Sequence, residues 1–178
     1  MSSDSLTPTS YRVLVLVGPG GAGAHDLVRM ARAGRVFQSP AESQFYAEPK
    51  RLARLGYLAA RKEPGKTRER THYELTEKGV DALREWMGEP ASSPQVVTDA
   101  IERLLAADLV GEPAVLESLG GMRADIEDLL DRVAGGVTVA DTLPHRRKYL
   151  LLNYALARAV LEAHLTWLDE VERQLDAD

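Results

Sequence analysis

Basic side chains gather in one stretch of the sequence, between Glu48 and His72. The stretch contains eight lysines and arginines against three glutamates. Such side chains neutralise phosphate groups, and a surface that binds DNA needs several of them close together. We therefore expect phosphate contacts here rather than an idle charged surface. The eight residues are Lys50, Arg51, Arg54, Arg61, Lys62, Lys66, Arg68 and Arg70.

Polar side chains at the start of this region have the chemistry to read bases. Gln44 can form two hydrogen bonds with adenine in the major groove, and Ser43 and Tyr46 suit phosphate or base edges. All three lie off the apolar face that Phe45 and Leu52 define. A solvated polar face is the alternative interpretation. We favour contact with DNA because the sequence predicts a β-hairpin directly afterwards.

The elements that carry these residues follow the order of a winged helix. Segments 11–17 (helix or strand) and 24–35 (helix) come first, and a capping box at 39–42 opens a third helix that should end at Gly56. Residues 57–62 and 70–75 predict two strands joined by a turn at 64–67, and residues 76–87 predict a further helix. In this arrangement the third helix is the recognition element and the hairpin is the wing.

A glycine-rich loop suggests a different function. Residues 13–17 are apolar, and Gly18, Gly20 and Gly23 then satisfy the G-x-G-x-x-G pattern, which binds dinucleotides when a strand leads into the loop. A nucleotide-binding sheet needs more strands alternating with helices, whereas the sequence after Glu42 offers one hairpin and no convincing strand beyond it. We favour a flexible turn between two helices and keep a small dinucleotide-binding enzyme as the alternative.

The second half of the chain is predicted to be helical. Residues 88–94 are rich in Gly, Pro and Ser and should link a domain at 1–87 to one at 95–178. From Val115 to Val133, apolar residues repeat at steps of four and three, which forms a seam for packing on another helix. The pair Gly135-Gly136 should end that helix. Residues 144–175 then predict a helix of up to about 48 Å.

The last predicted helix has two apolar stripes, more than one small domain can cover. We expect one stripe to pack within its own chain and the other against a second copy, which gives a homodimer. An aromatic small-molecule effector could bind between helices at Tyr154 and Trp167, although aromatics at this spacing usually form core. The dimer contact is assigned to Leu150, Tyr154, Leu161, Leu165 and Leu168. The second stripe consists of Tyr149, Leu152, Leu156, Val160 and Trp167.

Charge divides unevenly along the 178 residues, whose net charge is -5. Residues 1–87 hold 14 Lys and Arg against 10 Asp and Glu, whereas residues 88–178 hold 8 against 17. The first half can therefore face phosphate. Cysteine is absent and the four histidines lack close metal-ligand spacing, so we expect no metal and no cofactor.

Several functional classes find no support in the sequence. Apolar runs fall short of the roughly 20 residues that span a bilayer, and the first ten residues lack the charged start of a signal peptide. We therefore expect a soluble cytoplasmic protein with no membrane partner. Since no catalytic triad can be assembled from the sequence, we also expect that the protein is not an enzyme.

Four segments of the sequence resemble PadR-type regulators in order and spacing. These are residues 6–11, 44–52, 55–58 and 73–79, of which the last reads Y-x-L-T-E-K-G. The resemblance covers residues 6–87, and the second half is similar to the family only in being helical. It implies a mainly α (α+β) fold: an N-terminal winged helix-turn-helix with a two-stranded wing, then an all-helical dimerisation domain.

The resemblance also implies a function. It implies a homodimer that represses transcription by binding a pseudo-palindromic double-stranded DNA operator. In some members a small molecule relieves the repression. Tyr11, within the first matching segment, joins the residues expected to bind DNA. The sequence departs from the family at Pro49, where proline removes the amide that would bond to the carbonyl of Phe45, so the recognition helix should kink.

Overall fold

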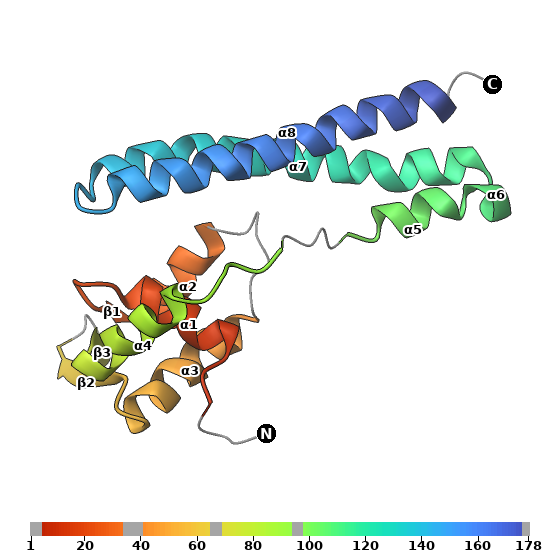
Figure 1. The fold of residues 1–178 in the computed structure, drawn as a ribbon. Coiled ribbons are helices and arrows are strands. Elements are labelled where there is room, and N and C mark those ends of the chain that lie inside the picture. The colour runs from red at the N-terminus through yellow and green to blue at the C-terminus, as the bar shows by residue number, and fades with distance from the viewer. Residues whose placement is uncertain (1–4, 34–40, 65–68, 94–97, 176–178) are drawn as a thin grey trace. The chain divides into compact units, whose positions relative to one another are not determined.

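The structure, a computed structural model, describes residues 5–33, 41–64, 69–93 and 98–175 (Figure 1). The chain divides into two compact units, Met1–Ser93 and Pro94–Asp178. The domain limits of 1–87 and 95–178 stay a prediction.

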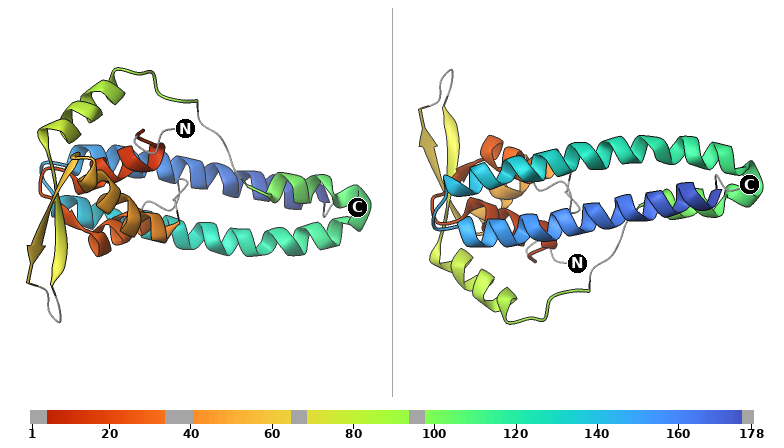
Figure 2. Two further views of the ribbon diagram at one scale, coloured as in Figure 1. Left: turned by 90° about the horizontal axis from the view of Figure 1, so that it is seen from below. Right: turned by 90° about the horizontal axis from the view of Figure 1, so that it is seen from above.

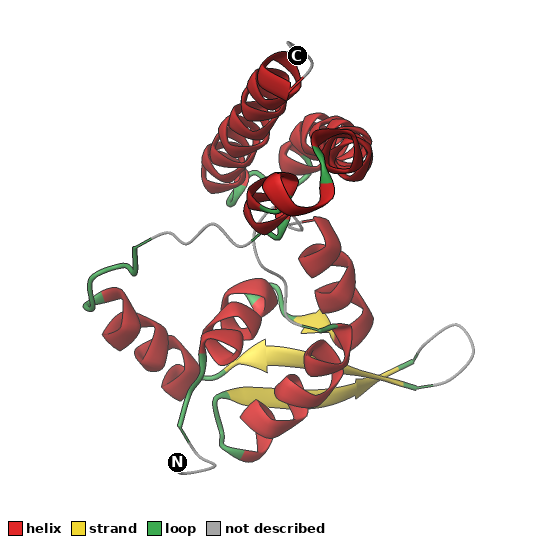
Figure 3. Cartoon of the chain, turned by 90° about the vertical axis from the view of Figure 1, so that its right-hand side faces the viewer, coloured by secondary structure: helices red, strands yellow, loops and turns green. Residues whose placement is uncertain are grey.

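The first unit is a winged helix. Its elements are α1 (Pro8–Val17), β1 (Ala22–Gly23), α2 (Ala24–Ala33), α3 (Glu42–Arg54), β2 (Leu58–Glu63), β3 (Arg70–Leu75) and α4 (Glu77–Met87). The strands form an antiparallel sheet in the order β1-β3-β2, which Figure 3 shows beside the helices. The prediction of a two-stranded wing missed β1, which pairs Ala22 with Tyr73 and Gly23 with His72. Two residues are too short for a periodic signal, so the sequence gives no sign of this strand.

Side chains from every helix-turn-helix element form the core of the first unit. Large apolar residues such as Leu14, Leu27 and Leu52 have no exposed surface. Complete burial of a side chain of this size contributes roughly 1.5–3 kcal/mol. The core therefore fixes α3 at a defined position against α1 and α2. The buried members are Val13, Leu14, Val17, Ala22, Leu27, Val28, Phe45, Leu52, Leu58 and Tyr73.

Hydroxyl caps set where two helices begin. Thr7 accepts a hydrogen bond from the Ser10 amide, and the Ser10 hydroxyl accepts one from the Thr7 amide, which completes a capping box ahead of Pro8. The Thr76 hydroxyl accepts a hydrogen bond from the Gly79 amide at the start of α4. Capping of this kind contributes about 1 kcal/mol for each helix.

The glycine-rich loop lacks the context that a dinucleotide needs. Residues 13–17 belong to α1, so a helix and not a strand leads into Gly18. Gly18 and Gly21 have φ values of 57° and 70°, in the region that favours glycine. The loop thus turns the chain from α1 into β1. This geometry differs from the strand, loop and helix that would cradle a pyrophosphate.

Pro49 lies inside α3 without ending it. The helix continues as one element to Arg54, and the proline ring is buried with Phe45 and Leu52. The ring therefore adds to the core that holds the helix, which offsets the backbone hydrogen bond that proline removes.

The second unit consists of helices. They are α5 (Ala100–Leu105), α6 (Ala107–Val110), α7 (Glu112–Asp141) and α8 (Arg147–Leu175). The two long helices lie side by side in both views of Figure 2. The expectation that Gly135-Gly136 ends a helix is wrong, because α7 continues through both glycines to Asp141. Within the described residues, no helix is long and apolar enough to cross a membrane.

Candidate nucleic-acid interface

The recognition helix presents an open polar face opposite its core face. Positions 43, 47, 50 and 54 follow steps of four, three and four, so they share one side of α3. All four side chains are exposed. Among the described residues, Ser43, Lys50 and Arg54 form no side-chain hydrogen bond or ion pair. Two cations and a hydroxyl are therefore available to an anionic partner.

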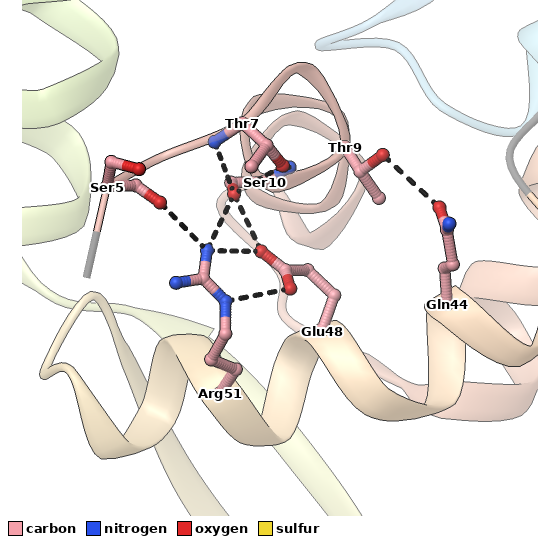
Figure 4. A network of polar contacts seen from close by, with 7 residues as sticks. All are labelled: Ser5, Thr7, Thr9, Ser10, Gln44, Glu48 and Arg51. Carbon is pink, nitrogen blue, oxygen red and sulfur yellow. Dashed lines mark hydrogen bonds and ion pairs between the residues drawn. The ribbon is translucent and has the colours of Figure 1, made fainter. Parts of the chain in front are cut away.

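One flank of this face is held by α1. The Thr9 hydroxyl donates to Gln44 Oε1 at 3.3 Å (Figure 4). Gln44 is exposed and lies beside the open face, as a base-reading side chain must. Its amide is nonetheless oriented by a neighbour before any DNA arrives.

The other flank is held by α2. Tyr46 Oη lies 3.1 Å from His25 Nδ1, and the two rings meet edge to face with centroids 5.5 Å apart. Tyr46 remains 37% exposed, so its hydroxyl can still face a partner. No pattern in the sequence predicts this contact between His25 and Tyr46.

Arg51 points into the domain instead of outward. Its guanidinium donates to both carboxylate oxygens of Glu48, at 2.8 and 3.0 Å, and to the Ser10 hydroxyl at 3.0 Å (Figure 4). It also donates to the Ser5 carbonyl at 3.3 Å. Only 21% of the Arg51 side chain is exposed. Arg51 therefore fixes α3 to the start of α1, and the DNA contact expected of it stays a prediction that this inward position does not support.

The carboxylate of Glu48 is stabilised in its charged form. The hydrogen bonds from Arg51 lower the pKa of Glu48, burial works against them, and the hydrogen bond from Ser10 lowers the pKa further. The result is a pKa below the ordinary value of 4.5. Glu48 is thus held in its ionised form by the same contacts that hold α3 against α1.

A second ion pair braces the recognition helix at its first turn. Arg32, in the last turn of α2, donates through Nε and Nη2 to the two carboxylate oxygens of Glu42, the latter bond measuring 2.8 Å. This bidentate pair ties the helices together across the connection between them. No pattern in the sequence pairs Glu42 with Arg32.

Tyr11 packs against another helix. Its ring stacks on Trp86 of α4 with centroids 4.8 Å apart and planes 11° apart. Desolvation, and then the charges of Glu89 and Glu85, raise the pKa of the Tyr11 hydroxyl. A ring in this stack orders α1 against α4, so the expected DNA contact by Tyr11 has no support from its position.

The described part of the wing carries compensated charges. Arg70 lies 3.3 Å from Glu63, and Arg61 lies 3.0 Å from both Glu63 and Glu74. All of these pairs are solvent-exposed on the arginine side, so each is worth little and can exchange for phosphate. Lys66 and Arg68, the other predicted wing contacts, lie outside the described residues.

Comparisons with known proteins agree with this architecture. No family model matches the chain. The negative transcriptional regulator PadR of Bacillus subtilis is 25% identical, over 94% of this chain and 97% of the relative. The crystal structure of that protein with operator DNA has a TM-score of 0.76 at 20% identity and covers 95% of this chain and 99% of the other. The chain is therefore similar to PadR in sequence and in fold.

Further structures show the same fold. A PadR-like transcriptional regulator from Bacillus cereus has a TM-score of 0.83 at 12% identity, covering 98% of this chain and 99% of the other. The Vibrio cholerae virulence activator AphA has a TM-score of 0.73 at 20% identity, covering 94% and 98%. Each match spans both units, so the helical second unit is also PadR-like, which the sequence supported only weakly.

The apolar stripes of α8 divide differently from the prediction. Leu161 and Leu168 are buried in the second unit, and Leu150, Tyr154 and Leu165 are half-buried. These five residues therefore pack mainly within their own chain. The stripe left open is the other one, with Tyr149 67% exposed, Leu152 63% and Leu156 56%. Any second copy on α8 of this PadR-like chain would meet that stripe.

The two residues assigned to an effector site do not share one. Trp167 lines a cavity of about 210 Å³ together with Thr98, Ile101, Ala163 and His164. Tyr154 instead lies against Gly136 of α7. The thirteen positions from Tyr154 to Trp167 correspond to about 20 Å along the helix axis. Of the two residues, Trp167 lines this cavity and Tyr154 does not.

Proposed function

We propose that the chain is a DNA-binding transcriptional regulator that represses its target as a homodimer. The observation that carries the proposal is the open face of α3, on which Lys50 and Arg54 have no side-chain partner in the part of the chain that the structure describes, while the helix is braced on both sides. A cation that has no partner inside the protein can meet phosphate without first breaking an ion pair. The similarity to the repressor PadR supports regulation as the biological role.

Single substitutions on α3 test the proposal. The probes are a duplex from upstream of the protein's own gene and a random-sequence duplex. Lys50→Ala and Arg54→Ala should each weaken binding and reduce the slope of log affinity against log salt by about 1. The slope falls because the variant makes one phosphate contact fewer and so releases fewer counterions from the DNA when it binds. Arg84→Ala removes the same charge from an exposed ion pair on α4 and serves as the control. Unchanged affinity and slope in both α3 variants would show that this face does not bind DNA.

The open stripe on α8 supports the homodimer. Large apolar side chains that adjoin one another on a helix need cover, and a second copy presents the same stripe. A two-fold dimer then binds a pseudo-palindromic operator with half-sites separated by a multiple of about 10–10.5 base pairs. Footprinting on the upstream duplex measures that spacing, and a single unrepeated half-site would contradict a symmetric dimer on DNA.

The cavity at Trp167 supports an aromatic effector. Bacillus subtilis PadR has been crystallised with p-coumaric acid. His164 Nδ1 lies 2.7 Å from the Val160 carbonyl and donates to it, since a carbonyl oxygen only accepts, so Nε2 is the ring nitrogen left for a ligand, and in a neutral ring it accepts. A flat molecule with a hydroxyl group suits an apolar cavity of this size with one acceptor. Fluorescence quenching in a Trp86→Phe background, which isolates Trp167, tests a panel of phenols; no quenching by any of them would remove this assignment.

A further inference from the structure

Thr9 lies where it can control what Gln44 offers to DNA. Its hydroxyl donates to Gln44 Oε1 at 3.3 Å, from the first turn of α1 to the first turn of α3 (Figure 4). Gln44 is exposed, whereas Thr9 is half-buried. The contact therefore joins a side chain on the DNA-facing flank to one that belongs to the frame of the domain.

The position of Thr9 is fixed by its neighbour. Ser10 is completely buried, and its hydroxyl donates to Glu48 at 2.6 Å. Glu48 lies one turn after Gln44 on the same side of α3, so consecutive residues of α1 contact consecutive turns of the recognition helix. Arg51 closes the arrangement by donating to both Glu48 and Ser10. The backbone at Thr9 thus cannot move away from α3 without the loss of this part-buried network.

The direction of the hydrogen bond decides which end of the amide is outward. A glutamine amide has one acceptor, Oε1, and one donor group, Nε2, on opposite sides of the amide carbon. Because Thr9 holds Oε1 toward α1, the two N–H groups of Nε2 turn away from α1. The major-groove edge of guanine offers two acceptors, O6 and N7, whereas adenine offers one acceptor and one donor. An outward Nε2 matches guanine.

We propose, on the basis of the proposed DNA-binding function, that Thr9 is a positioning residue that makes Gln44 select guanine. It does so without touching the base. The pairing with adenine that the sequence suggests for Gln44 needs Oε1 to face the groove, and the bond to Thr9 opposes that orientation. Loss of the Thr9 hydroxyl leaves the amide free to rotate, and adenine then becomes an equal or better partner.

Selection from a random-sequence duplex library by the full-length protein tests this role. Gln44→Ala identifies the operator position that Gln44 reads, because preference at that position should vanish. The wild type should prefer guanine there. Thr9→Val, which has the same shape without the hydroxyl, should lower the guanine-to-adenine ratio by about tenfold, the size of one base-specific contact. Thr9→Ser, which restores the hydroxyl, should keep the wild-type ratio.

The outcomes separate the two proposals. If Thr9→Val and wild type select the same base with the same ratio, the positioning role is overturned while DNA binding stands. Adenine preference in the wild type, or an unchanged profile in Gln44→Ala, also overturns it. If the wild type enriches no duplex at all, the proposed function fails and this inference with it. Thr9→Ala lacks the hydroxyl too and replaces Thr9→Val in the selection if the valine variant does not fold.

Discussion

The hydroxyl of Ser10 and the carboxylate of Glu48, 38 positions apart in the chain, are joined by a hydrogen bond of 2.6 Å. The hydroxyl also accepts hydrogen bonds from Arg51 and from the Thr7 amide. One buried atom thus connects the cap of α1 with the recognition helix. A helix that reads DNA must be held in a defined position, and this network adds polar bonds to the apolar packing beneath α3.

Ser10→Ala should lower the free energy of unfolding of the first unit by about 1–3 kcal/mol. The substitution removes one half of the capping box and one hydrogen bond each from Glu48 and Arg51, which stay paired with each other. Urea unfolding in a Trp167→Phe background measures it, since Trp86 then reports the first unit alone. Ser43→Ala, at an exposed site on α3, should stay within about 0.5 kcal/mol of the parent. Equal effects from both substitutions would contradict a special role for Ser10.

Glu48 should make the first unit less stable in acid. Its pKa in the folded protein is lowered, chiefly by the hydrogen bonds from Arg51. The stability that it contributes is therefore fully present above its ordinary pKa of 4.5 and is lost as the pH falls from there through the lowered value. Glu48→Gln cannot titrate, so the stability difference between wild type and variant should shrink across this window. A difference that stays constant from pH 6 to the acid limit would show that Glu48 is not the group responsible.

The Tyr11 ring should matter for stability and its hydroxyl should matter little for DNA. Tyr11→Phe keeps the stack on Trp86 and should leave DNA affinity within about twofold, because only a hydroxyl is lost. Tyr11→Ala should cost about 1–3 kcal/mol of stability through the lost ring packing. Filter binding and thermal unfolding measure the two quantities. A large loss of DNA affinity in Tyr11→Phe, with stability unchanged, would restore Tyr11 to the DNA interface.

Local signals in the sequence were sufficient for much of this fold. The hydroxyl at Thr76, the spacing of Phe45 and Leu52, and the turn residues between β2 and β3 each act over a few positions, so their effects can be predicted from neighbours. The inward turn of Arg51 depends instead on Ser10 and Ser5, more than forty positions away. Spacing along α3 identifies which residues leave the core face, but only tertiary contacts decide which of them remain open.

The open stripe of α8 should be the surface that holds two copies together. Replacing Leu152 and Leu156 by glutamate should convert the dimer into a monomer in analytical ultracentrifugation, because buried carboxylates without partners are costly at an apolar contact. Arg158→Glu, on the opposite side of the same helix, introduces the same charge and should leave the dimer intact. A dimer that survives both leucine substitutions would place the interface elsewhere.

Adjacent glycines in α7 should respond oppositely to alanine. A Cβ at Gly135 would have no atom within 4 Å, whereas a Cβ at Gly136 would lie 2.6 Å from Cζ of Tyr154. Gly135→Ala should therefore stabilise the helix by about 0.5–1 kcal/mol, since alanine loses less backbone entropy. Gly136→Ala gains the same propensity but must displace a half-buried ring, and overpacking of this kind costs about 1–3 kcal/mol.

A second background separates the clash at Gly136 from other effects. Without the ring, in a Tyr154→Ala background, Gly136→Ala should become stabilising and match Gly135→Ala, so the double-mutant cycle should show a coupling of more than 0.5 kcal/mol, the lower end of values for residues in contact. Urea unfolding followed by Trp167 fluorescence in a Trp86→Phe background measures the stability of all four variants.

The close approach of Tyr154 also explains why α7 continues where a glycine pair predicts its end. Because Gly136 has no side chain, Tyr154 packs on the backbone there. That contact stabilises the helix at two residues whose own helix propensity is low. If Gly136→Ala proved as stabilising as Gly135→Ala in the wild-type background, Tyr154 would have to pack elsewhere, and the continuity of α7 would need another cause.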